Sequence, residues 1–247
     1  MSDVVLPGLP ITRLIIWRHG RTEWNASGRF QGQLDPPLDD TGRAQAIAAA
    51  PLVAGGLSAG DTLVVSSDLS RATETAEALT GLLGVPLRVD ARLREHGLGS
   101  WEGLDRAEVA ERYPDQYADW LAGRPVEGRG GEEPADVAAR ALAALADLPE
   151  TVNAVVVTHG GTGVRLIEVL LQLSATHRRI FGPLGNCAWS ELLRQGDHWR
   201  LMRHNSSAPG AAQRREGVGD GRAVAVAPLP AGPEEDGPST GDADAVL

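Results

Sequence analysis

The sequence contains no lysine and only one cysteine among its 247 residues. Without lysine, the chain cannot form a lysine Schiff base or use the lysine of a phosphate-binding loop. The single Cys187 excludes an internal disulfide and a cysteine metal cluster, and it favours a reducing compartment. No segment approaches the roughly 18 apolar residues of a membrane span, and the first ten residues lack the basic start of a secretory signal. We therefore expect a cytoplasmic protein.

Positive charge is also in short supply. The chain has 33 acidic and 23 basic residues, a formal net charge of −10. An excess of acid disfavours binding to polyanions, so we expect neither nucleic acid nor a membrane as a partner. Part of the excess lies in residues 208–247, which are rich in Gly, Pro and Ala and offer few large apolar groups. We predict a lead-in over 1–11, one domain over 12–207 and a disordered acidic tail over 208–247.

Apolar runs alternate with helical patterns along the predicted domain. The runs 14–17, 62–65 and 154–157 predict strands buried on both faces of a parallel sheet. Apolar stripes predict helices over 41–53, over 69–83 with Asp68 as N-cap and Gly84 as its end, and over 137–148. Two shorter runs, 189–193 and 198–203, predict a hairpin. The alternation is typical of an α/β layered domain.

Polar side chains follow the three predicted parallel strands at the point where each ends. Arg18-His19-Gly20 follows the first, Ser66 to Arg71 the second and Thr158-His159-Gly160 the third. The carboxyl ends of parallel strands meet at one edge of a sheet, where ligands bind, so two arginines and two histidines should converge there. Guanidinium groups match phosphate oxygens, and an imidazole can attack phosphorus. The residues themselves therefore predict a site for a small phosphate ester.

These motifs, in this order, resemble the histidine phosphatase superfamily, also called the phosphoglycerate-mutase-like family. The matching segments are Arg18-His19-Gly20 with Thr22 and Asn25, Phe30-Gln31-Gly32, Ser66 to Leu69 with Arg71, Leu93-Arg94-Glu95 with Gly99 and Trp101 to Gly103, and Thr158 to Gly161. The resemblance covers about residues 12–205. It implies a three-layer α/β/α sandwich with a mostly parallel central sheet, and a phosphoric monoester hydrolase that needs no cofactor and no metal.

The resemblance also implies a role for each matching residue. His19 resembles the histidine that becomes phosphorylated, and Glu95 the general acid that protonates the leaving alcohol and then activates water. Arg18, Arg71 and His159 resemble the surrounding phosphate pocket. The supporting substrate-binding donors are Thr22, Asn25, Gln31, Gly32 and Gly160. His96, Trp24 and Trp101 lie beside these motifs and are candidates for the pocket wall.

Two other functions stay open on the sequence. The first is a cofactor-dependent phosphoglycerate mutase, and the second is a catalytically silent member that binds a phosphorylated ligand. Related mutases carry a long insertion after the acid and an arginine pair after a tryptophan, whereas here Trp120 is followed by Leu121-Ala122, although Arg106 resembles one basic clamp residue. The intact His19, Glu95 and His159 argue against the silent member. A phosphatase is the favoured interpretation.

The substrate is suggested only by a finer resemblance. The segments 31–35, 112–117, 186–189 and 199–201 resemble actinobacterial family members that include glucosyl-3-phosphoglycerate phosphatases. The expected partner is thus a small phosphorylated metabolite, and this sugar-linked phosphoglycerate is the first to test. Dimers are common in the family, so a homodimer stays open.

Overall fold

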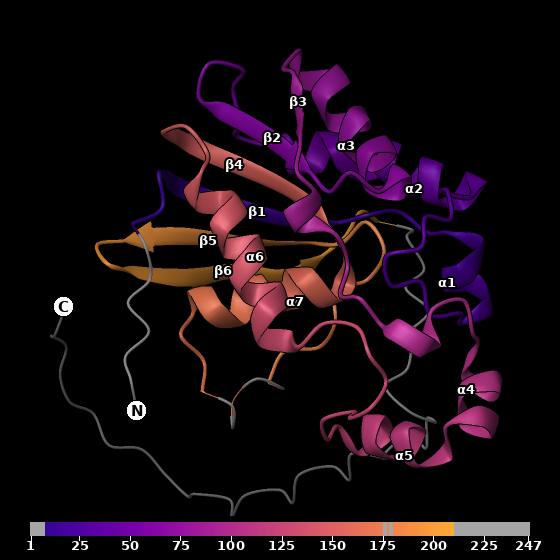
Figure 1. Cartoon of the computed structure of the whole chain (residues 1–247). Coiled ribbons are helices and arrows are strands. Elements are labelled where there is room, and N and C mark those ends of the chain that lie inside the picture. The colour runs from indigo at the N-terminus through magenta and orange to yellow at the C-terminus, as the bar shows by residue number, and fades with distance from the viewer. Residues whose placement is uncertain (1–7, 175–176, 178–179, 210–247) are drawn as a thin grey trace, which may run out of the picture. The chain divides into compact units, whose positions relative to one another are not determined.

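The structure, a computed structural model, describes residues 8–174, 177 and 180–209 (Figure 1). The predicted tail from residue 210 onward, and residues 1–7 of the predicted lead-in, lie outside the described residues. Within the described part, Leu9, Ile11 and Ala208 are buried, so apolar contacts extend slightly past both predicted domain boundaries. No helix in this part is both long and apolar enough to cross a membrane.

A six-stranded sheet forms the centre of the domain, with the order β3-β2-β4-β1-β5-β6. Its strands are β1 (Ile11–Arg18), β2 (Thr62–Ser66), β3 (Leu87–Val89), β4 (Thr151–Thr158), β5 (Trp189–Gln195) and β6 (His198–Ser206). The pairs β3-β2, β2-β4 and β4-β1 are parallel, whereas β5 and β6 add an antiparallel hairpin at one side. The three predicted buried strands and the predicted hairpin are confirmed, and the short β3 was not predicted.

Helices cover both faces of this sheet because its central strands are apolar on both faces. Leu14 and Ile16 of β1 pack with α6 (Pro134–Ala146) and α7 (Gly160–Leu170), and the alternate residues Ile15 and Trp17 pack with α2 (Asp40–Val53) and α3 (Ser70–Leu83). Figure 1 shows α6 and α7 in front of the sheet. Successive side chains of a strand point to opposite faces, so a continuous apolar run fills two cores at once. The three-layer sandwich is confirmed.

The remaining helices belong to the loops that follow the parallel strands. These are α1 (Glu23–Ser27), α4 (Arg106–Arg112) and α5 (Pro114–Ala122), with short 3₁₀ turns at Ala91–Leu93 and Gly99–Trp101. One expectation about these loops is wrong: Asp68 does not cap α3, whose N-cap Leu69 makes no side-chain bond. Asp68 instead accepts two hydrogen bonds from Arg94, of 2.7 and 2.5 Å. This ion pair ties the loop after β2 to the segment that carries Glu95.

Candidate active site

A pocket of about 280 Å³ opens where the parallel strands end. It is lined by seven of the predicted site residues, namely Arg18, His19, Asn25, Gln31, Gly32, Arg71 and Glu95. Of the three candidates for its wall, Trp24 and His96 line it, whereas Trp101 is fully buried and donates its indole N–H to Gln116 Oε1 at 2.9 Å. Thr22, His159 and Gly160 are not among the residues that line it.

His19 lies at the buried end of this pocket, where β1 gives way to a loop. Its Nδ1 is 2.6 Å from the carbonyl oxygen of Gly20. A carbonyl can only accept, so Nδ1 carries the proton and Nε2 keeps its lone pair. Burial, then the charges of Arg71 and Arg18, lower the pKa of His19 well below its usual value. The site therefore holds a neutral imidazole with its nucleophilic nitrogen defined.

The backbone around His19 is fixed by residues far away in the sequence. The side-chain nitrogen Nδ2 of Asn186 donates to the carbonyl oxygens of both His19 and Gly20, each at 3.3 Å. The backbone N–H of Gly20 donates to Thr75 Oγ1 at 3.0 Å. A side chain at position 20 would place its Cβ 2.5 Å from the carbonyl oxygen of Gly42. Position 20 thus requires glycine. Asn186 and Thr75 support the backbone of His19 and Gly20, a role that the sequence did not predict for either residue.

Two buried guanidinium groups flank His19. Arg71 is completely buried and donates to the carbonyl oxygens of Leu34 at 2.7 Å and Gly32 at 2.9 Å. Burial lowers the pKa of Arg71 to about 10. Arg18 is 8 % exposed and donates to the carbonyl oxygen of Leu184 at 2.6 Å. Two cations held this deep in the protein favour a small anion bound between them.

His159 lies directly against His19, between the end of β4 and the start of α7. The two ring centroids are 5.1 Å apart, and both ring nitrogens of His159 are buried with no hydrogen-bond partner among the described residues. Burial, followed by the charges of Arg71, His19 and Arg18, lowers the pKa of His159 well below its usual value. A buried polar group without a partner costs about 1–3 kcal/mol, and a bound oxyanion would supply the missing acceptor.

The carboxylate of Glu95 lies at the amino end of α7. Its Oε1 accepts hydrogen bonds from the backbone N–H of Thr162 at 3.0 Å and of His96 at 2.8 Å, and its Oε2 accepts from Gly161 N at 3.0 Å. The Cβ of any side chain at position 161 would lie 2.6 Å from Oε1. Backbone donors at a helix amino end suit a carboxylate, and they hold this one at the pocket edge.

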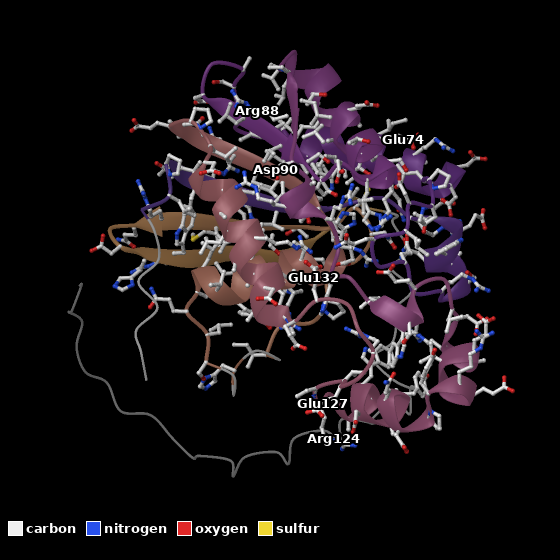
Figure 2. The ribbon with its side chains drawn as sticks, in the orientation of Figure 1. Glu74, Arg88, Asp90, Arg124, Glu127 and Glu132 are labelled. Carbon is white, nitrogen blue, oxygen red and sulfur yellow. The ribbon has the colours of Figure 1, made fainter. Side chains whose placement is uncertain are left out.

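Arg140 of α6 fixes the segment around Glu95. It donates to the carbonyl oxygens of Arg92 at 2.6 Å, Arg94 at 2.8 Å and Glu95 at 3.0 Å, and it pairs with Glu132 at 2.6 Å. Glu132, labelled in Figure 2, also accepts from Gly97 N at 2.8 Å. Glu132 thus links the loop before α6 to the segment that carries Glu95.

Thr22 positions two residues of the pocket lining, Asn25 and Gln31, through hydrogen bonds. It is fully buried and caps α1, accepting from Asn25 N at 3.1 Å, and its hydroxyl lies 3.1 Å from Gln31 Oε1. Asn25 Oδ1 also accepts from Asn186 at 3.1 Å. Because the amide oxygens of Asn25 and Gln31 are engaged within the protein, each amide can offer its NH₂ group to a ligand. Their conformations suit an anion in the pocket.

The site combines one nucleophile, one carboxylate and several donors for an anion. No group of three His, Cys, Asp or Glu residues within the described part of the chain is arranged to hold a metal ion. The arrangement can take a phosphoryl group onto Nε2 of His19 and stabilise its oxygens with guanidinium and imidazole donors.

Comparisons with known proteins agree with this chemistry. Residues 14–207 match the model of the histidine phosphatase superfamily (branch 1). A protein named glucosyl-3-phosphoglycerate phosphatase from Mycolicibacterium vanbaalenii is 39 % identical over 223 residues, covering 80 % of this chain and 96 % of the relative. A protein named probable phosphoglycerate mutase from Salmonella paratyphi C is 35 % identical, covering 74 % and 85 %. The solved structure of mycobacterial glucosyl-3-phosphoglycerate phosphatase with VO3 has a TM-score of 0.71 and 40 % identity, covering 79 % of this chain and all of that one.

Proposed function

The chain belongs to the histidine phosphatase superfamily, as an enzyme that hydrolyses phosphomonoesters of small metabolites, and we propose that it does so through a phosphohistidine at His19. The observation that carries the proposal is the state of His19. Its Nδ1 is protonated against the Gly20 carbonyl, and its Nε2 lies in a pocket lined by Arg18 and Arg71. A neutral nucleophile beside fixed cations is what attack on an anionic phosphate ester requires.

In the first step, Nε2 of His19 attacks phosphorus and the bond from phosphorus to the ester oxygen breaks. Glu95, in its protonated form, gives its proton to the departing alkoxide. The guanidinium groups of Arg18 and Arg71, together with His159, bind the phosphoryl oxygens as charge spreads over them. The products of this step are the free alcohol, phosphorylated His19 and the Glu95 carboxylate.

In the second step, water replaces the alcohol at the same position. The Glu95 carboxylate takes a proton from the water, whose oxygen attacks phosphorus. The nitrogen–phosphorus bond breaks, and its electron pair returns to Nε2 of His19. Inorganic phosphate leaves, and both residues regain their starting protonation states. The hydrogen bonds from Gly161 and Thr162 hold Glu95 near the pocket for both steps.

For the substrate, we propose glucosyl-3-phosphoglycerate. The proposal is supported by the named activity of the mycobacterial relatives and by the extent of the match, which covers nearly the whole length of those chains. The pocket wall also suits such a compound, since it adds aromatic rings from Trp24, Phe30 and Trp120 to the phosphate-binding end. Aromatic faces are common partners for sugar rings and other flat or apolar ligand surfaces.

A panel of phosphomonoesters ranked by kcat/KM tests the proposal. We expect phosphate release without added metal and in the presence of a chelator, the highest kcat/KM for glucosyl-3-phosphoglycerate, and no turnover by His19→Ala. Phosphate binding without any turnover would support the silent member instead. Faster conversion of 3- to 2-phosphoglycerate than hydrolysis would support the mutase. A glucosyl ester no better than a generic phosphomonoester would refute the substrate assignment alone.

A further inference from the structure

Asn186 is the centre of a group of hydrogen bonds beside the nucleophile. Its side-chain nitrogen Nδ2 donates to the carbonyl oxygens of His19 and Gly20, each at 3.3 Å, and to Asn25 Oδ1 at 3.1 Å. Two of these acceptors are backbone carbonyls, which cannot donate, so the orientation of the Asn186 amide is defined. Asn186 is not among the residues that line the pocket. Its effect on the reaction therefore passes through the residues that it holds.

The carbonyl of Gly20 connects Asn186 to the ring of the nucleophile. This oxygen accepts the proton of His19 Nδ1 at 2.6 Å, and Asn186 supplies a second donor to it. A glycine carbonyl rotates more freely than that of other residues, because no Cβ restricts the backbone. The hydrogen bond that one ring nitrogen of a histidine makes decides which nitrogen carries the proton. A Gly20 carbonyl that turned away would therefore release the tautomer of His19.

The segment that carries Asn186 is itself held on both sides. Gly185 N donates to Asn205 Oδ1 at 2.8 Å, and Cys187 N donates to the carbonyl oxygen of His19 at 3.1 Å. Asn205 and Cys187 have positive φ angles of 54° and 55°, which are uncommon for residues other than glycine. Such conformations persist only where the surrounding structure determines them. The backbone at Asn186 thus has the fixed position that support of a catalytic group requires.

The phosphate-binding donors have supports other than Asn186. Arg18 and Arg71 donate to backbone carbonyls at other positions. Asn25 Oδ1 also accepts from the backbone N–H of Thr22 at 3.1 Å, so a support for the Asn25 amide remains when Asn186 is replaced. Loss of the Asn186 amide should therefore change the nucleophile more than it changes the affinity of the pocket for an anion.

We propose that Asn186 is a positioning residue of the reaction: by holding the Gly20 carbonyl, it keeps the proton of His19 on Nδ1 and leaves Nε2 free to attack phosphorus. This inference rests on the proposed function, and it deepens that function by naming the residue that sets the state of the nucleophile. Asn186 itself neither gains nor loses a proton in either step.

Nuclear magnetic resonance of the histidine side chains measures the tautomer without any turnover. The full chain is labelled with ¹⁵N in its six histidines, and the His19 signals are those missing from His19→Gln. At about pH 8, above the ordinary pKa of histidine, we expect a protonated Nδ1 and an unprotonated Nε2 for His19 in the wild type. In Asn186→Ala the two ¹⁵N shifts of His19 should move toward each other, because both tautomers are then populated.

Kinetics show whether this change reaches the reaction. Asn186→Ala should lower kcat/KM for p-nitrophenyl phosphate by about 10- to 100-fold, since a nucleophile that is misplaced or in the wrong tautomer attacks slowly. The Kd of inorganic phosphate should change by less than about threefold, because Arg18 and Arg71 keep their places. Asn186→Asp keeps the shape of the side chain but puts an oxygen where the donors were, so it should shift the tautomer and kcat/KM in the same direction.

Asn153→Ala is the matched control, since it removes the same side chain from the opposite end of the sheet. Asn153 is buried and lies beside Arg13 near the start of β1, whereas His19 follows the end of that strand. Its Nδ2 donates to Asp61 Oδ1 at 3.1 Å. This variant should melt at a lower temperature than the wild type but keep the wild-type tautomer of His19 and the wild-type kcat/KM.

Three results would overturn the inference: wild-type ¹⁵N shifts of His19 in Asn186→Ala, an equal change of these shifts in Asn153→Ala, or a Kd of phosphate that rises by the same factor as kcat/KM falls. If thermal melting shows that Asn186→Ala does not fold, the same criteria apply to Asn186→Asp. Failure of the proposed function looks different, since the wild type then forms no phosphohistidine, while the ¹⁵N shifts still decide whether Asn186 sets the tautomer.

Discussion

Replacement of Gly161 by alanine should displace the carboxylate of Glu95 and thereby test its role apart from those of the other site residues. Alanine suits a helix better than glycine, by about 1 kcal/mol, and the backbone at this position requires no left-handed conformation. The new Cβ would lie 2.6 Å from Glu95 Oε1 and 3.3 Å from its Cδ. The carboxylate must therefore move by about 1 Å to reach ordinary contact distance. The variant therefore adds one methyl group and displaces one catalytic carboxylate.

The expected loss of activity follows from this displacement. A misplacement of about 1 Å can lower a rate by about 100-fold. The effect should depend on the leaving group, because kcat/KM reports the steps up to departure of the alcohol. An alkyl phosphate needs a proton from Glu95, so its kcat/KM should fall about 100-fold. p-Nitrophenyl phosphate has a leaving group that departs as an anion, and its kcat/KM should fall by less than about fivefold.

Stability should change little in the same variant. Loss of hydrogen bonds from Gly161 and Thr162 to the carboxylate costs about 1.5–3 kcal/mol, and the gain in helix propensity offsets about 1 kcal/mol of it. Gly81→Ala, in α3 with no atom within 4 Å of the new Cβ, is the control and should keep full activity. Equal losses with both substrates, or none with the alkyl phosphate, would refute the role assigned to Glu95.

Three further predictions concern charge and burial. Burial lowers the pKa of His19 and His159, so below about pH 6.5 only the unfolded chain takes up a proton on these histidines. As the pH decreases below this value, the free energy of unfolding should fall by up to about 1.4 kcal/mol per pH unit for each histidine. Urea unfolding at a series of pH values that shows no such fall down to about pH 5.5 would contradict this. Inorganic phosphate at 100 times its Kd should stabilise the fold by about 2.7 kcal/mol, a rise in Tm of about 5–10 °C, which Arg71→Gln should lose. Arg140→Gln should lower the free energy of unfolding by about 2–3 kcal/mol and reduce kcat more than it changes KM, because Arg140 holds the Glu95 segment without lining the pocket; unchanged kcat would argue against this positioning role.

The central strands were predictable because burial on both faces leaves a direct trace in the sequence. In contrast, α5 has no fully buried residue and α4 buries only Val109, so neither produces an apolar stripe. The edge strand β3 is three residues long and has two exposed positions. Helix α7 begins with Gly160-Gly161 and Gly163, which reads as a loop. Elements with little burial or with glycine at their start leave weak patterns.

The site also contains residues that the sequence predicted and residues that it did not. The convergence of Arg18, His19, Arg71 and Glu95 was predictable because each follows a strand or belongs to an ordered motif, and the structure places all four on one pocket. The residues that hold them were not predictable from local sequence. Arg140 acts across 45 residues on Glu95, and Asn186 acts across 167 residues on His19. Such contacts depend on tertiary packing alone.

The arginines that line the pocket show why the net charge of the chain was a limited guide to the ligands that it binds. An excess of acid in the whole chain argues against polyanions, yet the pocket concentrates five arginines around one carboxylate. A field of this kind acts over about 8–10 Å at physiological ionic strength. It can select a small dianion or trianion without attracting a long nucleic acid.

Direct detection of phosphorylated His19 tests the central claim. The enzyme is mixed with excess substrate, quenched in alkaline denaturant to preserve the acid-labile bond, and digested for mass spectrometry. With p-nitrophenyl phosphate, whose leaving group departs without a proton from Glu95, Glu95→Gln should increase the trapped fraction by slowing hydrolysis of the intermediate. His19→Ala should abolish it. The account predicts one added phosphoryl group on the peptide that contains His19. Turnover with no phosphorylated peptide, or with the phosphoryl group on another residue, would contradict it.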